Sequence, residues 1–162
     1  MLPRFNTTTL AAAVTVFVCL IGIGAASAAS PFPTLQGSWS GSGRIQFENG
    51  ASESLRCTAY YTSSDGGGQL GLAIRCASAA NRIEIRGRLT NNGGRVSGTW
   101  QETTFNASGS AAGRANDNSV VLRLSGDIAG SMSVSVTKTR QTVSISTQTA
   151  SLRGVRIGLS RR

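Results

Sequence analysis

The stretch CTAYYTSSDGGGQLGLAIRC, residues 57–76, holds two cysteines on either side of a glycine-rich segment. A hairpin whose turn lies within Asp65–Gly68 places Cys57 directly opposite Cys76 and keeps the apolar residues of both strands on one face. Residues that face each other across two antiparallel strands are about 4.5–5.5 Å apart, which is within the range of a disulfide. We therefore predict a hairpin that is pinned by a buried structural disulfide.

Two other roles for Cys57 and Cys76 fit the sequence less well. Their spacing is not the C-x-x-C of a redox-active pair. Two thiolates would need further ligands to hold zinc, and the chain contains no histidine. A disulfide between them closes a loop of about twenty residues and stabilises the fold by roughly 3 kcal/mol.

The same alternation of apolar and polar residues continues through the rest of the chain. In GSWSGSGRIQF, residues 37–47, Trp39, Ile45 and Phe47 share one face while Ser and Arg take the other. Turn dipeptides separate such segments, and helix signals are absent. We predict an all-β protein, an antiparallel up-and-down meander that closes into a soluble barrel, with a two-sheet β-sandwich as the alternative. About ten strands are expected, at 37–47, 51–63, 69–77, 82–90, 95–103, 107–116, 119–126, 130–138, 141–148 and 152–161.

The turn positions test this meander, because a slip of one residue would turn the apolar side of a strand outward. A two-residue turn at Asn92–Gly93, a favoured hairpin pair, places Leu89 opposite Val96. The other turns are placed by the same rule, with Glu48–Gly50 setting Trp39 opposite Ala59 and Asp117–Asn118 setting Ala115 opposite Val120.

The first and last strands are expected to meet, because an even number of strands lets them pair antiparallel. Arg161 shares the inward parity of Leu159, so it can stack on Trp39 as a cation–π pair that closes this end of the barrel. The segment GSWS, residues 37–40, resembles the G-x-W signature of the calycins, the lipocalin and avidin superfamily. In calycins an arginine from the last strand packs across this tryptophan, a role that the resemblance gives to Arg161 or, as the alternative, to Arg156.

A longer pattern covers most of the chain beyond the N-terminal segment. It resembles a group of small exported proteins of alphaproteobacteria in the segments GSWSGSGRI, LRC, IRCAS, GGRVSGTWQE and VRIGLSRR. This resemblance implies an exported protein of the expected shape and implies no particular activity.

The N-terminus has the features of a secretory signal peptide. One arginine precedes an apolar run, and Ala-Ser-Ala at residues 26–28 matches the A-x-A cleavage pattern. We predict a cleaved signal peptide at 1–28, a short extension at 29–36 and a single β-barrel domain at 37–162. The mature protein is then periplasmic or extracellular, in an oxidising compartment where its two cysteines would pair.

The chain is strongly basic, with 16 Lys and Arg against 7 Asp and Glu and a net charge of +9. Such a charge favours anionic partners, and export makes nucleic acid an unexpected one. Strand parity groups several arginines on the outside of consecutive early strands, where Glu84 opposite Arg75 offsets part of the charge. This patch could hold an anionic envelope component by bidentate contacts or could simply keep the surface solvated. Its residues are Arg44, Arg56, Arg75, Arg82, Arg86 and Arg88.

A membrane barrel is not expected. Such barrels turn apolar residues outward and carry aromatic girdles. Here one strand face is filled with Trp, Ile, Leu and Val, and the other with Ser, Thr and Arg. The apolar face therefore predicts an interior rather than a lipid contact, and the mature chain should not span a membrane.

Residues for the common catalytic chemistries are scarce. The absence of histidine removes a Ser-His-Asp triad, a Cys-His pair and the commonest metal ligand. An S-x-x-K match at Ser135–Lys138 falls on a strand, where positions three apart point to opposite faces. We expect no catalytic residue, no metal and no cofactor, and hence no enzyme.

Two carboxylates stand out because strand parity turns them inward. Glu53 and Glu102 fall at the end of the barrel opposite Trp39, with Phe47 and Phe105 nearby. These four residues are candidates for binding a cationic or hydroxylated ligand. The alternatives are a general acid–base pair in which one pKa is raised, or two strand-end carboxylates that reach water or pair with an arginine.

Two functions therefore compete. The first is a non-enzymatic exported barrel that binds a small, hydrophobic or weakly polar molecule in its interior. The second is a module that docks its arginine-rich outer face on an anionic envelope component while the interior is packed. An enzyme or an enzyme inhibitor ranks behind both, and the sequence does not determine the oligomeric state.

Overall fold

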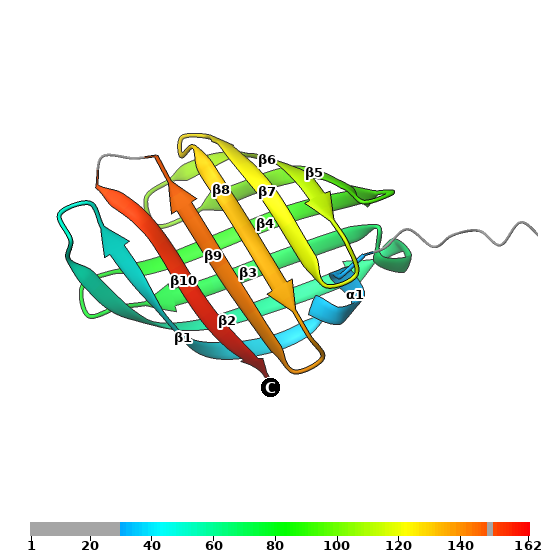
Figure 1. Ribbon diagram of the computed structural model, residues 1–162, viewed down its shortest axis with the longest axis horizontal. Coiled ribbons are helices and arrows are strands. Elements are labelled where there is room, and N and C mark those ends of the chain that lie inside the picture. The colour runs from blue at the N-terminus through cyan, green and yellow to red at the C-terminus, as the bar shows by residue number, and fades with distance from the viewer. Residues whose placement is uncertain (1–29, 149–150) are drawn as a thin grey trace, which may run out of the picture.

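The chain forms a closed barrel of ten strands, in which each strand pairs with the next and β10 pairs with β1 (Figure 1). The structure, a computed structural model, describes residues 30–148 and 151–162. Every pairing is antiparallel, which confirms the meander, and the unbroken ladder excludes a two-sheet sandwich. The strands are β1 (Gly37–Phe47), β2 (Ser52–Ser64), β3 (Gln69–Ala77), β4 (Arg82–Asn92), β5 (Arg95–Glu102), β6 (Ala107–Ala115), β7 (Ser119–Gly126), β8 (Gly130–Val136), β9 (Arg140–Thr147) and β10 (Leu152–Arg161).

The β2–β3 hairpin has the register that its cysteines predicted. Cys57 lies opposite Cys76 with the two Cα atoms 4.1 Å apart, and the pair forms a disulfide. A short 3-10 helix, η1 (Asp65–Gly67), makes the turn between the strands. Both cysteines are buried, so the predicted buried cross-strand disulfide is confirmed.

Two other predicted turns are also confirmed. The β1–β2 turn sets Trp39 opposite Ala59, and its last residue, Gly50, takes a left-handed conformation with φ of 84°. The β6–β7 turn sets Ala115 opposite Val120. The apolar faces of these strands therefore meet in the expected register.

The β4–β5 turn differs from the prediction, which was wrong by two residues. Leu89 lies opposite Gly98 rather than Val96. The turn is made by Gly93 and Gly94, whose φ angles are both positive, at 59° and 83°. A type I′ turn needs positive φ at both central positions, and two glycines supply it without strain. Because the slip is two residues, the inward face of each strand is unchanged.

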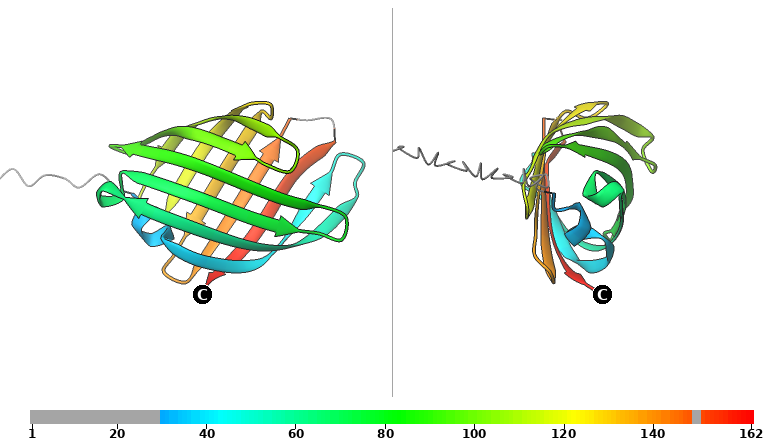
Figure 2. Two further views of the ribbon diagram at one scale, coloured as in Figure 1. Left: turned by 180° about the vertical axis from the view of Figure 1, so that it is seen from behind. Right: turned by 90° about the vertical axis from the view of Figure 1, so that its right-hand side faces the viewer.

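The barrel is flattened, so that two walls face each other across the interior (Figure 2). Aliphatic and aromatic side chains at the inward positions form one buried core. Ser, Thr and Arg occupy most of the outward positions. This distribution is the reverse of that in a membrane barrel.

A short helix, α1 (Phe32–Leu35), lies across one end of the barrel (Figure 2). Phe32 and Leu35 are both buried against the strands. The sequence indicated only an extension at 29–36, because four residues carry too little periodicity to predict a helix. Packing against the strands, rather than helix propensity, stabilises α1. The predicted signal peptide at 1–28 lies outside the described residues. No helix in the described part of the chain is long and apolar enough to cross a membrane.

Candidate ligand cavity

An apolar cavity of about 210 Å³ lies inside the barrel. Residues from α1 and from most of the strands line it, and most of them are Ile, Leu, Val or Met. A cavity of about 150 Å³ with walls of this kind is large enough for benzene, and typical small-molecule pockets have about 300–1,000 Å³. The volume therefore suits a small molecule, such as one with one or two rings or a short alkyl chain.

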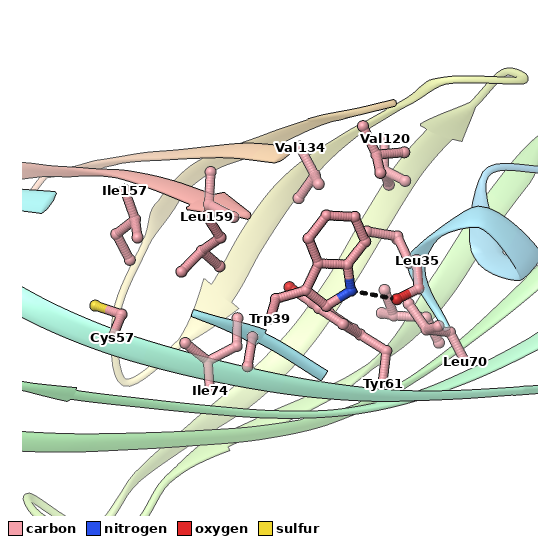
Figure 3. Close-up of a cluster of buried hydrophobic side chains, with 14 of the residues drawn as sticks. Leu35, Trp39, Cys57, Tyr61, Leu70, Ile74, Val120, Val134, Ile157 and Leu159 are labelled. Carbon is pink, nitrogen blue, oxygen red and sulfur yellow. Dashed lines mark hydrogen bonds between the residues drawn. The ribbon is translucent and has the colours of Figure 1, made fainter. Parts of the chain in front are cut away.

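One end of the barrel is closed around Trp39. This side chain is fully buried, and its indole N–H donates a hydrogen bond to the Leu35 carbonyl at 2.7 Å (Figure 3). The Arg161 guanidinium lies 4.3 Å from the centroid of the indole ring, which is the contact that strand parity predicted. The same guanidinium donates hydrogen bonds to the backbone carbonyls of Thr34, Gln36 and Lys138. Arg161 thus ties β10, α1 and the β8–β9 turn together over Trp39.

The opposite end is more open. Phe105, in the turn after β5, is 65% exposed and still contributes to the cavity wall. Ile128, in the turn after β7, and Leu152, at the start of β10, are half-buried and line the cavity as well. Apolar side chains of the cavity wall are therefore partly exposed to solvent at this end.

A polar pair lies within the core near the closed end. Tyr61 contributes to the apolar wall of the cavity, and its hydroxyl donates a hydrogen bond to Gln141 Oε1 at 3.1 Å. Burial raises the pKa of Tyr61, and the bond to Gln141 offsets only part of that rise, so the hydroxyl stays neutral. Gln141 is 2% exposed, and its Nε2 has no hydrogen-bond partner among the described residues. Sequence reasoning missed this pair, although Gln141 shares the inward parity of the neighbouring Val143.

Glu102 borders the cavity, but its carboxylate is engaged by the backbone. It accepts hydrogen bonds from the N–H groups of Phe105 (2.6 Å), Thr104 (3.0 Å) and Glu84 (3.1 Å). Burial pulls the pKa of Glu102 upward, but these backbone donors together outweigh it, so the pKa lies below its usual range. The side chain is therefore an ionised cap on the β5–β6 turn.

Glu53 and Phe47 do not belong to the described wall of the cavity. Glu53 lies opposite Ile45, and its Oε2 is buried without a hydrogen-bond partner among the described residues. Phe47 is half-buried and packs against the core. Of the four residues predicted to bind a ligand, the structure brings Glu102 and Phe105 to the cavity and places the other two elsewhere.

The arginines that strand parity turned outward are all exposed on the barrel surface. They are Arg44 in β1, Arg56 in β2, Arg75 in β3 and Arg82, Arg86 and Arg88 in β4. Glu84 lies 3.2 Å from Arg75 Nε and 2.7 Å from Arg86 Nη2, and these two guanidinium groups hold the pKa of Glu84 below its usual range. The predicted pairing of Glu84 with Arg75 is therefore confirmed.

Comparison with known proteins finds similarity in the fold but not in the sequence. No family model and no curated protein matches the chain. Among solved structures, it is similar to Rv2717c from M. tuberculosis, with a TM-score of 0.64 and 14% identity over 80% of this chain and 93% of that one. It is also similar to the S-type phycobiliprotein lyase CPES from Guillardia theta, with a TM-score of 0.57 and 14% identity over 81% and 90%. The fold is calycin-like. At this level of identity the likeness extends to the fold alone.

Proposed function

We propose that this calycin-like barrel binds a small, mostly apolar molecule in its interior. The observation that carries the proposal is the cavity itself. Its wall is mostly aliphatic, and a pocket of this kind as small as about 150 Å³ takes up benzene. A small apolar molecule that fills it removes its own surface and that of the wall from water, at about 25 cal/mol per Å².

The composition of the wall supports an apolar ligand. Most of the lining side chains are aliphatic or aromatic, and Gln141, whose Nε2 has no partner among the described residues, is not one of them. Tyr61 lines the cavity, but its hydroxyl is engaged with Gln141. The ligand therefore needs no polar group to match the described wall.

We propose binding rather than catalysis. The chain has no histidine, and the one carboxylate on the described cavity wall, Glu102, is held by backbone N–H groups. One of the similar structures described above is named as a lyase. The ligand experiment should therefore also look for an altered molecule.

The most direct experiment is native mass spectrometry of the mature protein purified from its own source. A retained molecule of low molecular mass is the expected result, and its identity after release shows whether the protein has changed it. The same spectrum tests the proposed export, because cleavage after Ala28 leaves a chain that begins at Ala29. Protein that carries no molecule and takes up none from its own cell extract would contradict the proposal.

A matched pair of substitutions tests the cavity directly. Ala111 lines the cavity, whereas the neighbouring Ala112 is exposed on the outside of β6. Ala111→Leu should fill the cavity, weaken binding of bromobenzene by about tenfold or more, and raise the free energy of unfolding by about 0.5–2 kcal/mol. Binding is measured by quenching of Trp100, which also lines the cavity.

Ala112→Leu is the control and should leave bromobenzene binding unchanged. If Ala111→Leu instead destabilises the fold by about 1–3 kcal/mol, as overpacking of a filled core does, and bromobenzene binding is unaffected, the interior is not a binding site.

A further inference from the structure

The outer surface of β10 and β1–β4 carries an arginine face whose charge is poorly balanced. We define it as Arg44, Arg56, Arg75, Arg82, Arg86, Arg88 and Arg156. Arg44 lies directly opposite Arg156 on the paired strands β1 and β10, and like charges in this position destabilise a sheet. Within the described part of the chain, the ion pairs are those of Glu84 with Arg75 and Arg86. Arg44 and Arg156 thus repel each other, and no ion pair between described residues offsets this cost in stability. Proteins accept such local costs mainly at functional surfaces.

Two shallow grooves cross this face. The first, of about 940 Å³, is bordered by Arg56, Arg75 and Arg82 together with hydroxyl side chains of β1 and β2. The second, of about 810 Å³, is bordered by Arg86 and Arg88 and has the small residues Gly71 and Ala73 in its wall. Both grooves therefore offer guanidinium groups beside small or hydroxyl-bearing side chains.

The two grooves continue into each other along the strands. Thr58 borders the first groove and Tyr60 the second, and they are neighbouring outward positions of β2. Glu84 and Arg86 have the same relation on β4. Outward positions two residues apart are about 6.6 Å apart along a strand. The grooves thus form one basic track over β2–β4.

We infer that the arginine face binds an acidic polysaccharide chain along this track on the outside of the barrel. Guanidinium groups bind carboxylate, sulfate or phosphate groups in bidentate fashion. Ser, Thr and Gln side chains on the track match sugar hydroxyls, and the Tyr60 ring, 56% exposed, provides a flat surface for a sugar ring.

The shape and composition of the face favour a linear chain over a lipid bilayer. The face is the curved outer wall of a barrel, so a flat bilayer would reach only part of the track (Figure 2). Tyr60 is the one large hydrophobic side chain that is exposed on the described part of this face, whereas membrane-surface elements insert several apolar side chains. A flexible polyanion can follow the grooves.

The test compares two variants that remove equal charge from different sides of the barrel. Arg56→Gln/Arg82→Gln/Arg88→Gln alters the track, and Arg95→Gln/Arg114→Gln/Arg123→Gln alters the outer face of β5–β7. None of these arginines takes part in an ion pair between described residues. Binding of fluorescent polygalacturonate to the mature protein is measured at about 0.15 M salt, with neutral dextran as the uncharged chain.

We expect the dissociation constant for polygalacturonate to rise about tenfold or more in the track variant and less than about twofold in the β5–β7 variant, with no binding to dextran. Equal weakening in both variants would mean that net charge alone attracts the polymer, and would overturn the inference. It is also overturned if the unaltered protein ignores polygalacturonate, binds dextran equally well, or prefers phosphatidylglycerol vesicles in a way that depends on the same arginines.

Discussion

The two ends of the barrel are built from the same strands but are filled very differently. At the closed end, Trp39 in β1 and Phe32 in α1 have no exposed surface. At the open end, Phe105 is 65% exposed, and inward side chains such as Met132 and Leu152 remain half-buried. Buried, closely packed contacts resist local opening, whereas exposed elements with few contacts open at low cost. The closed end is therefore the more tightly packed of the two, and the open end has the lower resistance to local opening.

Removing one aromatic side chain from each end tests whether the two ends contribute differently to stability. Trp39→Ala deletes a buried indole and its hydrogen bond to Leu35, and should lower the free energy of unfolding by about 3–5 kcal/mol. Phe105→Ala, at the open end, should change it by less than about 0.5 kcal/mol. Urea denaturation of both variants provides the measurement. Similar losses in the two variants would show that the ends do not differ in this way.

A smaller effect is expected from the arginine that covers Trp39. Arg161→Lys keeps the charge but loses the planar fork that stacks on the ring and bonds the carbonyls of Gln36 and Lys138. We expect a loss of about 1–2 kcal/mol in unfolding free energy. The control is Arg162→Lys, at the next position, which should be neutral. If Arg161→Lys is also neutral, the guanidinium does not close this end.

The smallest effect concerns Glu102 at the open end. Its pKa is lowered in the folded protein, so its stabilising contribution is present above the unfolded value of about 4.3 and is lost as the pH falls through the lower folded value. Glu102→Gln should therefore cost about 1 kcal/mol at pH 7 and progressively less as the pH is lowered toward about 2. Urea unfolding of both proteins at the two pH values measures this difference.

Glu48→Gln, in the exposed β1–β2 turn, is the control for loss of one negative charge and should leave the free energy of unfolding nearly unchanged. A cost of Glu102→Gln that is equal at both pH values would mean that the carboxylate charge is not what caps the β5–β6 turn.

The alternation of apolar and polar residues predicted the strands and most of their pairing. Cys57 and Cys76 could be placed opposite each other because a slip of one residue would have turned apolar side chains outward. The same criterion could not detect the two-residue error at Gly93–Gly94, because a slip of two residues preserves both faces. Alternation thus determines the face of a residue better than its partner.

The candidate site was less accessible to sequence reasoning. Strand parity correctly turned Glu102 inward, but it gives no information on the backbone N–H groups that engage the carboxylate, because those come from a turn. It also left Gln141 unnoticed, although an inward polar residue among valines and isoleucines was visible in the sequence. The helix α1 depends on contacts with distant strands, which a local pattern does not contain.

The pairing of β10 with β1 has a consequence for how the chain reaches this state. The Arg161 side chain donates a hydrogen bond to the carbonyl of Gln36, which lies 125 positions earlier in the chain. The barrel therefore cannot close until β10 has been synthesised. Contacts this distant in sequence slow folding. Until β10 docks, β1 and β9 are open edges with unpaired backbone groups, and such edges recruit other chains. The final strand therefore protects the molecule from self-association as much as it completes the wall.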